Sequence, residues 1–185
     1  MKKTILIFAA IVMMAGLTTR TMAQVTLLGQ ADAGAELVKV LTIAQTTPLH
    51  FGVIGITAGT AGTVVMTTAG ARTPNTLATT IINSGTQRTV ALFSLTGTTD
   101  DIYGITMEDH IHISIGAGTG TSATTISDIM LNVDDEGEAA LNSGVSHGQL
   151  LLGVSTFLLS GKLNIASDQV VGVYAGHYDV TVDYQ

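Results

Sequence analysis

The final residues of the chain alternate strictly between apolar or aromatic side chains and polar ones. On an extended backbone, one face carries Tyr178, Val180, Val182 and Tyr184. The other face carries Asp179, Thr181 and Asp183. This period of two predicts a half-buried β-strand that ends with the chain. No segment follows to cover its outer edge, so its free N–H and C=O groups are either shielded by neighbours or available to another chain.

The composition extends this prediction to the rest of the chain. Gly is frequent at 21 residues, Pro is rare at 2, and Thr, Val, Ile and Leu are abundant, which is typical of short strands joined by Gly-rich turns. The expected strands span residues 36–44, 63–67, 77–82, 89–96, 103–107, 110–115, 126–133, 149–154, 157–165 and 178–184. Expected turn signals include Asn83-Ser84-Gly85, Gly116-Ala117-Gly118 and Ser160-Gly161. Strands at this spacing predict an all-β fold, an antiparallel β-sandwich.

The amino-terminal segment has the pattern of a cleavable secretory signal peptide. Two lysines, Lys2 and Lys3, precede an apolar run over residues 4–17, and small residues at Thr21 and Ala23 mark a cleavage site. We therefore expect residues 1–23 to be a signal peptide, 24–36 an amino-terminal extension and 37–185 the β-sandwich domain. No later apolar run approaches the roughly 20 residues of a spanning helix, so no membrane span is expected after cleavage.

Charge and cysteine content exclude several classes of partner and site. The chain has no Cys, so a disulfide framework and a thiolate metal site are both excluded. Its formal net charge is −7 with only 7 Lys and Arg. Nucleic acid requires clustered basic residues to neutralise its phosphates, so no nucleic-acid partner is expected. The same charge disfavours anionic membrane surfaces.

Two short motifs resemble metal sites without completing one. His110 and His112 share a strand face, but two imidazoles do not fill a tetrahedral shell and the spacing fixes no third ligand. Asn132, Asp134 and Glu136 precede Gly137 like the start of a calcium loop, yet Ser143 stands where the bidentate Glu is required. We expect no metal and no cofactor.

Catalytic constellations are also missing from the sequence. The adjacent pairs Asp100-Asp101 and Asp134-Asp135 would point to opposite sides of an extended chain. Ser146 and His147 lack the strand-to-helix context of a serine nucleophile. The sequence therefore indicates that the protein is not an enzyme.

Several segments together resemble the secreted family known as domain of unknown function 4402. The resemblance opens with Leu41-Thr42-Ile43, followed by Leu49-His50-Phe51-Gly52, and ends with Val180-Thr181-Val182-Asp183-Tyr184. The segments that carry it are residues 41–43, 49–54, 62–66, 69–72, 91–97, 150–154, 161–165, 172–176 and 180–184. It covers nearly all of the expected mature chain. The resemblance implies an immunoglobulin-like β-sandwich of bacterial envelopes and surfaces, and names no activity.

The carboxyl-terminal strand also resembles that of chaperone–usher pilus subunits. Tyr184 is the penultimate aromatic residue and Gly172 is the fourteenth residue from the end, although the cysteine pair common in those pilins is missing. The resemblance implies that the final strand pairs with a periplasmic chaperone, and that the groove beside it later receives the extension of the next subunit. A candidate donor face in the extension carries Val25, Leu27, Gly29, Ala31 and Ala33. The alternation equally fits a strand that closes a self-sufficient sandwich.

These patterns predict a non-enzymatic structural subunit, secreted through the periplasm to the cell surface or an extracellular fibre. Its assembly strand would be the segment marked by Gly172, Tyr178, Val180, Val182 and Tyr184. Its expected partners are copies of itself or related subunits, a periplasmic chaperone and an outer-membrane usher. The alternative is an extracellular carbohydrate- or protein-binding module of the adhesin kind, which the absence of Trp disfavours.

Overall fold

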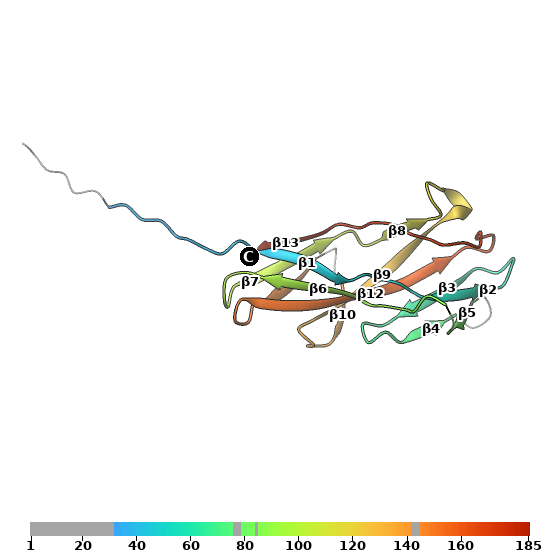
Figure 1. Ribbon diagram of the computed structural model, residues 1–185, viewed down its shortest axis with the longest axis horizontal. Helices are drawn as coiled ribbons and strands as arrows, with labels where there is room; N and C mark the ends of the chain where they lie inside the picture. The colour runs from blue at the N-terminus through green and yellow to red at the C-terminus, as the bar shows by residue number, and fades with distance from the viewer. Residues whose placement is uncertain (1–31, 76–78, 84, 142–144) are drawn as a thin grey trace, which may run out of the picture. The chain divides into compact units, whose positions relative to one another are not determined.

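The structure is a computed structural model that describes residues 32–75, 79–83, 85–141 and 145–185. Residues Leu37–Gln185 form one compact unit (Figure 1). Its strands are β1 Thr42–Thr47, β2 Val53–Ile56, β3 Gly62–Met66, β4 Arg72–Pro74, β5 Thr79–Ile82, β6 Ala91–Thr96, β7 Ile102–Met107, β8 Ile111–Ser114, β9 Ala123–Val133, β10 Glu138–Ala140, β11 Val145–Gln149, β12 Val154–Ile165 and β13 Val180–Tyr184. The 3-10 helix η1, Gly120–Ser122, is the single helical element among the described residues.

All strand pairs are antiparallel and they form two main layers. The larger sheet runs β1-β6-β12-β3-β4; β9 pairs with the other side of β12, and β8 and β10 pair with β9. The smaller sheet has the order β11-β7-β13, while β2 and β5 form a separate pair. The expected all-β antiparallel sandwich is thus confirmed.

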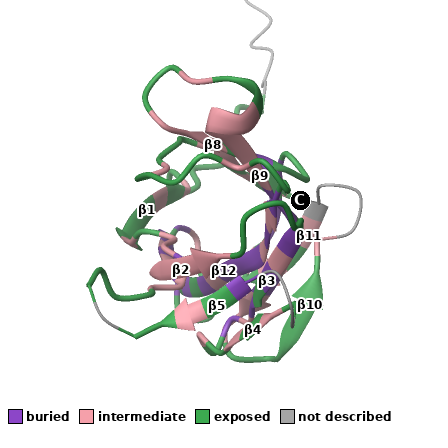
Figure 2. Ribbon diagram, turned by 90° about the vertical axis from the view of Figure 1, so that its right-hand side faces the viewer, coloured by how far each residue is buried: buried purple, intermediate pink, exposed green. Residues whose placement is uncertain are grey.

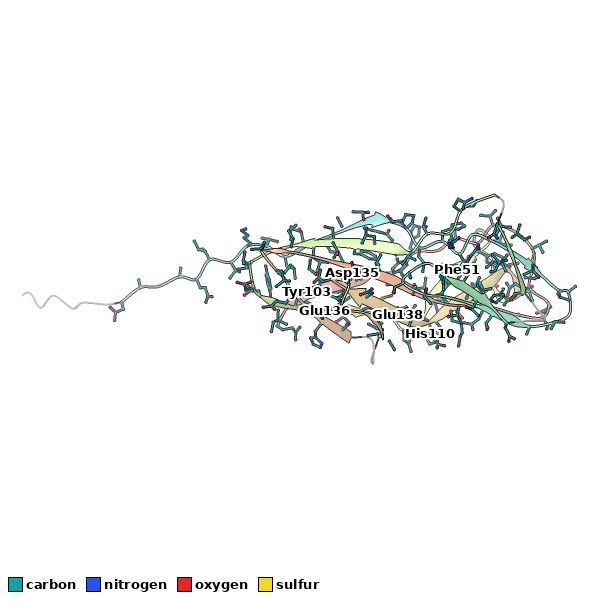
Figure 3. All side chains as sticks on the ribbon, turned by 90° about the horizontal axis from the view of Figure 1, so that it is seen from below. Phe51, Tyr103, His110, Asp135, Glu136 and Glu138 are labelled. Atoms are coloured by element: carbon teal, nitrogen blue, oxygen red, sulfur yellow. The ribbon has the colours of Figure 1, made fainter. Side chains whose placement is uncertain are left out.

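The core lies between these layers because alternate residues of their strands point inward. Ala91, Phe93 and Leu95 of β6 are buried, and they share one cluster with Tyr103 and Ile105 of β7. The buried stretches lie on and beside β12 and β3 in Figure 2, whereas β10 is exposed at the periphery. Tyr103 and Phe51 lie well apart in Figure 3, so the core extends along the unit.

The last segment of the chain crosses from one sheet to the other. Ala175 forms an isolated β-bridge with Ser114, the last residue of β8. Further along the chain, β13 pairs with β7. Because β8 belongs to the larger sheet and β7 to the smaller one, this segment ties the two layers together. β13 then ends as an edge strand of the smaller sheet.

Some strand boundaries differ from those expected. Residues 149–154 do not form a strand, because the chain reverses there: Val154 N–H bonds to Leu151 O, and Leu152 and Gly153 both have positive φ, 54° and 80°. These values and the closing bond define a type I′ turn between β11 and β12. The expected first strand, 36–44, is displaced to Thr42–Thr47.

Ser160-Gly161 is not a turn but lies inside β12, opposite a β-bulge in β9. The register between these strands shifts between Ser160 and Lys162, and Asp128 in β9 has a φ of 47°. A Cβ atom on Gly161 would lie 2.9 Å from both Ile126 Cγ2 and Ser127 O. Gly161 therefore allows two backbones to approach closely at a bulge. Because glycine is also common in turns, the sequence alone did not distinguish the two.

Candidate assembly site

The carboxyl-terminal strand lies at a sheet edge with the alternation that the sequence predicted. Tyr178, Val180, Val182 and Tyr184 are half-buried and pack against the core, whereas Asp179, Thr181 and Asp183 are exposed. On one side β13 pairs with β7 from Val180↔Met107 to Tyr184↔Tyr103. Its other side has no strand partner among the described residues.

The first strand of the unit is also an edge strand, and it faces the same gap. β1 pairs with β6 alone, and no backbone hydrogen bond joins it to β13 within the described ranges. A groove of about 470 Å³ opens between the two edges. Its lining residues are Ile43, Gln45, Pro48, Leu49, Phe93, Gly176, His177, Tyr178 and Val180. Two strand edges without a partner among the described residues thus flank one groove, whose lining is mixed: apolar side chains alternate with Gln45, His177 and the Tyr178 hydroxyl.

Aromatic rings form part of the groove wall. Phe93 stacks on Phe157 with ring centroids 4.7 Å apart and meets Tyr178 edge-on at 6.4 Å. Tyr178 Oη accepts a hydrogen bond from Gln45 Nε2 across the groove, at 3.1 Å. Burial raises the pKa of Tyr178 to about 12, and the bond from Gln45 opposes this in part. The rings offer apolar contact area and the tyrosine hydroxyl stays neutral at physiological pH.

Tyr184 bridges the two sheets at the far end of the same strand. Its hydroxyl donates to Lys39 O at 2.9 Å and accepts from Thr98 N–H at 2.8 Å. Gly97 allows this approach, since a Cβ atom there would lie 2.8 Å from Leu150 Cδ1 and would overlap the Tyr184 hydroxyl. Tyr184, the penultimate aromatic residue, therefore connects the end of β13 to the segment before β1 and to the loop after β6.

Gly172 and the candidate donor segment are the remaining residues that the sequence predicted for assembly. Gly172 is exposed in the segment before β13, where its Cα passes close to Ile115. Of the candidate donor residues, Val25, Leu27, Gly29 and Ala31 lie outside the described residues. Ala33 is described and has no regular secondary structure. The structure thus brings together the acceptor residues of β13 and leaves the donor pairing as a prediction.

The groove's contribution from β1 was missed by the sequence reasoning. Gln45 lies beyond the expected first strand, and no local pattern places it opposite Tyr178, 133 positions later in the chain. Phe93 is buried in β6, and its place beside the last strand depends on how the sheets pack. The one sequence feature that pointed to this groove was the alternation of apolar and polar residues in β13.

The histidine pair stays on the surface. His112 is exposed on β8, and His110 Nδ1 lies 2.6 Å from Asp109 Oδ1. Within the described ranges no three His, Asp or Glu side chains form a group that could hold a metal ion.

The acidic motif forms a turn whose side chains bond to the protein itself. Asp134 Oδ1 accepts from Thr156 N–H at 2.8 Å and its Oδ2 from Ser155 Oγ at 2.7 Å. Asn132 Oδ1 accepts from Gly137 N–H at 3.1 Å. Ser155 also contacts the hydroxyl of the buried Tyr103. Asp134 and Asn132 therefore fix the β9–β10 turn.

A second, shallow depression of about 480 Å³ lies over β3, β9 and β12. Its polar lining includes Thr63, Asn75, Thr124, Thr125, Asn164 and Gln169. The amide of Asn164 donates to Thr125 and Ser127, and that of Gln169 donates to Thr121 O, Ala123 O and Tyr174 Oη. These amides serve the fold, which leaves few free donors for a ligand.

Comparison with known proteins identifies a family and no named relative. The family model described as Domain of unknown function (DUF4402) matches residues 41–184, which is most of the chain. The search of curated proteins found no match. No helix in the described part of the chain is long and apolar enough to cross a membrane.

Proposed function

The chain belongs to the family described as Domain of unknown function (DUF4402), and we propose that it is a non-enzymatic structural subunit that assembles by accepting a strand from another copy. The observation that carries this proposal is the groove between β1 and β13. Both of its borders are edge strands that have no further strand partner among the described residues, and its wall offers the apolar side chains of Ile43, Leu49 and Phe93. A strand inserted there could bond to β13 through its main chain and bury alternate side chains in the groove.

The donor in this proposal is the amino-terminal extension of another copy. Val25, Leu27, Gly29, Ala31 and Ala33 would share one face of an extended strand. The larger side chains of Val25 and Leu27 supply apolar anchors, while the small residues that follow allow close approach to the groove. Register follows from the period of two, because a slip by one residue would place the polar side chains in the groove.

The signal-peptide prediction supports the cellular setting of this proposal. A chain cleaved after Ala23 would pass through the periplasm and begin with the donor segment at Gln24. Its partners would be a periplasmic chaperone and an outer-membrane usher in transit, then further copies at the cell surface or in an extracellular fibre. Intact-mass measurement of exported protein tests the first step, because retention of residues 1–23 would contradict it.

Deletion of residues 24–33 from the mature chain tests strand donation. We expect the shortened chain to fold and to fail to polymerise, as measured by size-exclusion chromatography and electron microscopy. Val182→Asp, in contrast, should damage the fold itself by placing a charge on the packed face of β13. A mature chain that stays monomeric at high concentration and in its native host, with no effect of the deletion, would replace this proposal with a self-sufficient sandwich.

Two adjacent substitutions provide a matched control within the full mature chain. Leu27→Asp places a charge on the donor face, whereas Thr26→Asp places it on the opposite face. Only Leu27→Asp should abolish assembly. A peptide of residues 24–33, added at about 100 times its dissociation constant, should stabilise the Leu27→Asp chain by about 2.7 kcal/mol. Equal effects of the two substitutions would argue against insertion of an alternating donor.

The alternative function, a carbohydrate- or protein-binding module, rests on the shallow depression over β3, β9 and β12. Its hydroxyl and amide lining is the feature that favours a sugar ligand. The amides of Asn164 and Gln169 are already bonded within the protein, and no Trp is available to stack on a sugar ring. Glycan-array binding that is lost in Thr124→Ala, together with a monomeric mature chain, would favour this alternative.

A further inference from the structure

Two exposed apolar patches lie at opposite ends of the Leu37–Gln185 unit. The tip patch consists of Ile102, Leu151, Leu152 and Val154 around the β11–β12 turn. The loop patch consists of Val170, Val171 and Val173, which follow β12. The 12 residues of β12 separate the two patches, a span of roughly 35–40 Å. Figure 1 shows β12 running from the turn at one end toward the loop at the other.

The tip patch contains a residue that the isolated unit does not explain. Leu152 has a φ of 54° and the residue is 87% exposed. Asn, Asp or Gly adopts this position of a type I′ turn at lower cost, because a leucine Cβ is crowded at positive φ. Leu151 beside it is also 57% exposed. The fold gains no core contact from Leu152, so a contact outside the subunit accounts better for an apolar residue there.

The tip patch lies at the end of the unit from which the amino-terminal extension leaves. Lys39 N–H donates to Thr98 Oγ1, and Gly97 N–H donates to Gly153 O in the β11–β12 turn. A donor segment that ends at Ala33 is joined to Leu37 by four peptide steps, a reach of about 14 Å at most. The subunit that donates a strand must therefore stand directly against the one that accepts it, with its tip patch at the contact.

The direction of strand addition decides which end of the acceptor meets this tip patch. A donor antiparallel to β13 emerges beside Gly176 and Tyr178, at the end near the loop patch. A donor parallel to β13 would emerge at the opposite end and bring two tip patches together in a closed dimer. Antiparallel addition forms the stronger ladder and covers both patches.

We propose that the tip patch of one copy packs on the loop patch of the next copy in a head-to-tail fibre; this inference rests on the proposed strand donation. The contact is heterologous, so each copy keeps one free patch and growth continues without closure. Its apolar character also allows contact between copies that are each strongly acidic, since the full chain has a formal charge of −7 and the expected cleavage removes the basic residues Lys2, Lys3 and Arg20.

The absence of Cys from the chain permits a direct test by cross-linking. Mature full-length Leu152→Cys and Val171→Cys chains are prepared separately, with different tags, and mixed under mild oxidation. We expect disulfide-linked pairs of the two different chains, and little linkage in either variant alone. A Thr73→Cys chain, altered at an exposed position of β4, serves as the control for random collisions. Efficient linkage of Leu152→Cys to itself would overturn the head-to-tail arrangement.

The donor variant separates failure of this inference from failure of the proposed function. The Leu27→Asp substitution, introduced into both cysteine chains, should remove the cross-link together with assembly. If fibres form and depend on Leu27 but the mixed chains do not cross-link, strand donation holds and the patch contact is wrong. If the mature chains do not assemble at all, or assemble regardless of Leu27, the proposed function fails and this inference fails with it.

Leu152→Asn provides a second readout with two effects of opposite sign. Asn tolerates the positive φ of this turn and removes the apolar side chain. At concentrations too low for assembly, the melting temperature of the mature chain should rise or stay unchanged. The concentration required for assembly should rise about tenfold. A lower melting temperature with unchanged assembly would mean that Leu152 serves only the fold.

Discussion

The hydroxyl of Tyr184 donates a hydrogen bond to the carbonyl oxygen of Lys39, 2.9 Å away. The penultimate residue of the chain therefore holds the segment that leads into β1, the first strand. The same hydroxyl accepts from Thr98 N–H in the loop between β6 and β7. One end of the groove is thus bridged by a side chain, while beyond it the facing edges of β1 and β13 have no backbone partner in the part of the chain that the structure describes.

Tyr184→Phe should lower the free energy of unfolding by about 1 kcal/mol, because it removes a hydroxyl that satisfies two backbone groups. Chemical denaturation measures the loss, and the amide of Thr98 should exchange faster with solvent. Thr181→Val, on the exposed face of the same strand, is the control and should change stability little. If both variants match the parent chain, the bonds to Lys39 and Thr98 contribute nothing to the fold.

Tyr178 should make stability fall at high pH. Its pKa is about 12 in the folded chain, against about 10 for an exposed tyrosine. The folded state therefore binds the phenolic proton more tightly, so this contribution is complete below about pH 10 and is lost as the pH rises toward 12. Denaturation midpoints measured across this interval should fall.

Tyr178→Phe supplies the comparison for that pH profile. The decline should be shallower in this variant but not absent, because burial also raises the pKa of Tyr103. An identical decline in the two proteins would show that Tyr178 does not carry the effect.

Gly148→Ala should destabilise the fold by about 1–3 kcal/mol. Gly148 lies opposite Tyr103 in the β11–β7 ladder, and an added Cβ atom would lie 2.5 Å from Tyr103 Cζ. The ring is fully buried and its hydroxyl is bonded to Ser155, so it cannot move aside cheaply. Thermal denaturation of Gly148→Ala and of the control Gly55→Ala measures the difference.

Gly55 is a suitable control because it also lies in a strand, β2, and its added Cβ atom would meet neighbours at 3.4 Å or more. Gly55→Ala should be neutral or slightly stabilising, since alanine loses less backbone entropy than glycine on folding. Equal losses in the two variants would show that contact with Tyr103 is not the cause.

Micromolar zinc or calcium should leave the melting temperature nearly unchanged. Both carboxylate oxygens of Asp134 accept hydrogen bonds from the protein, and His112 lies exposed on β8. A native-state ligand at 100 times its dissociation constant would add about 2.7 kcal/mol, or roughly 2–8 °C. A shift of that size, removed by His112→Ala for zinc or by Asp134→Asn for calcium, would reveal a site.

The alternation of β13 could be read from its sequence because it is a local property. The inward residues Val180 and Val182 and the exposed residue Asp183 follow from a backbone period of two once the segment is extended. The same reasoning failed at Leu151-Leu152-Gly153, where consecutive apolar residues indicated a strand. The turn there uses an unusual leucine at positive φ, for which the sequence contains no favourable local signal.

By itself the sequence determined the fold class and the half-buried edge strand at the end of the chain, because periodicity and turn residues act over a few neighbours. Only the tertiary structure decided that Gln45 lies opposite Tyr178, that Tyr184 meets Lys39, and that the tip and loop patches lie at opposite ends. These relationships join residues more than a hundred positions apart or depend on the length of β12. They arise when two sheets pack, and no local pattern specifies which strand edges then face the same gap.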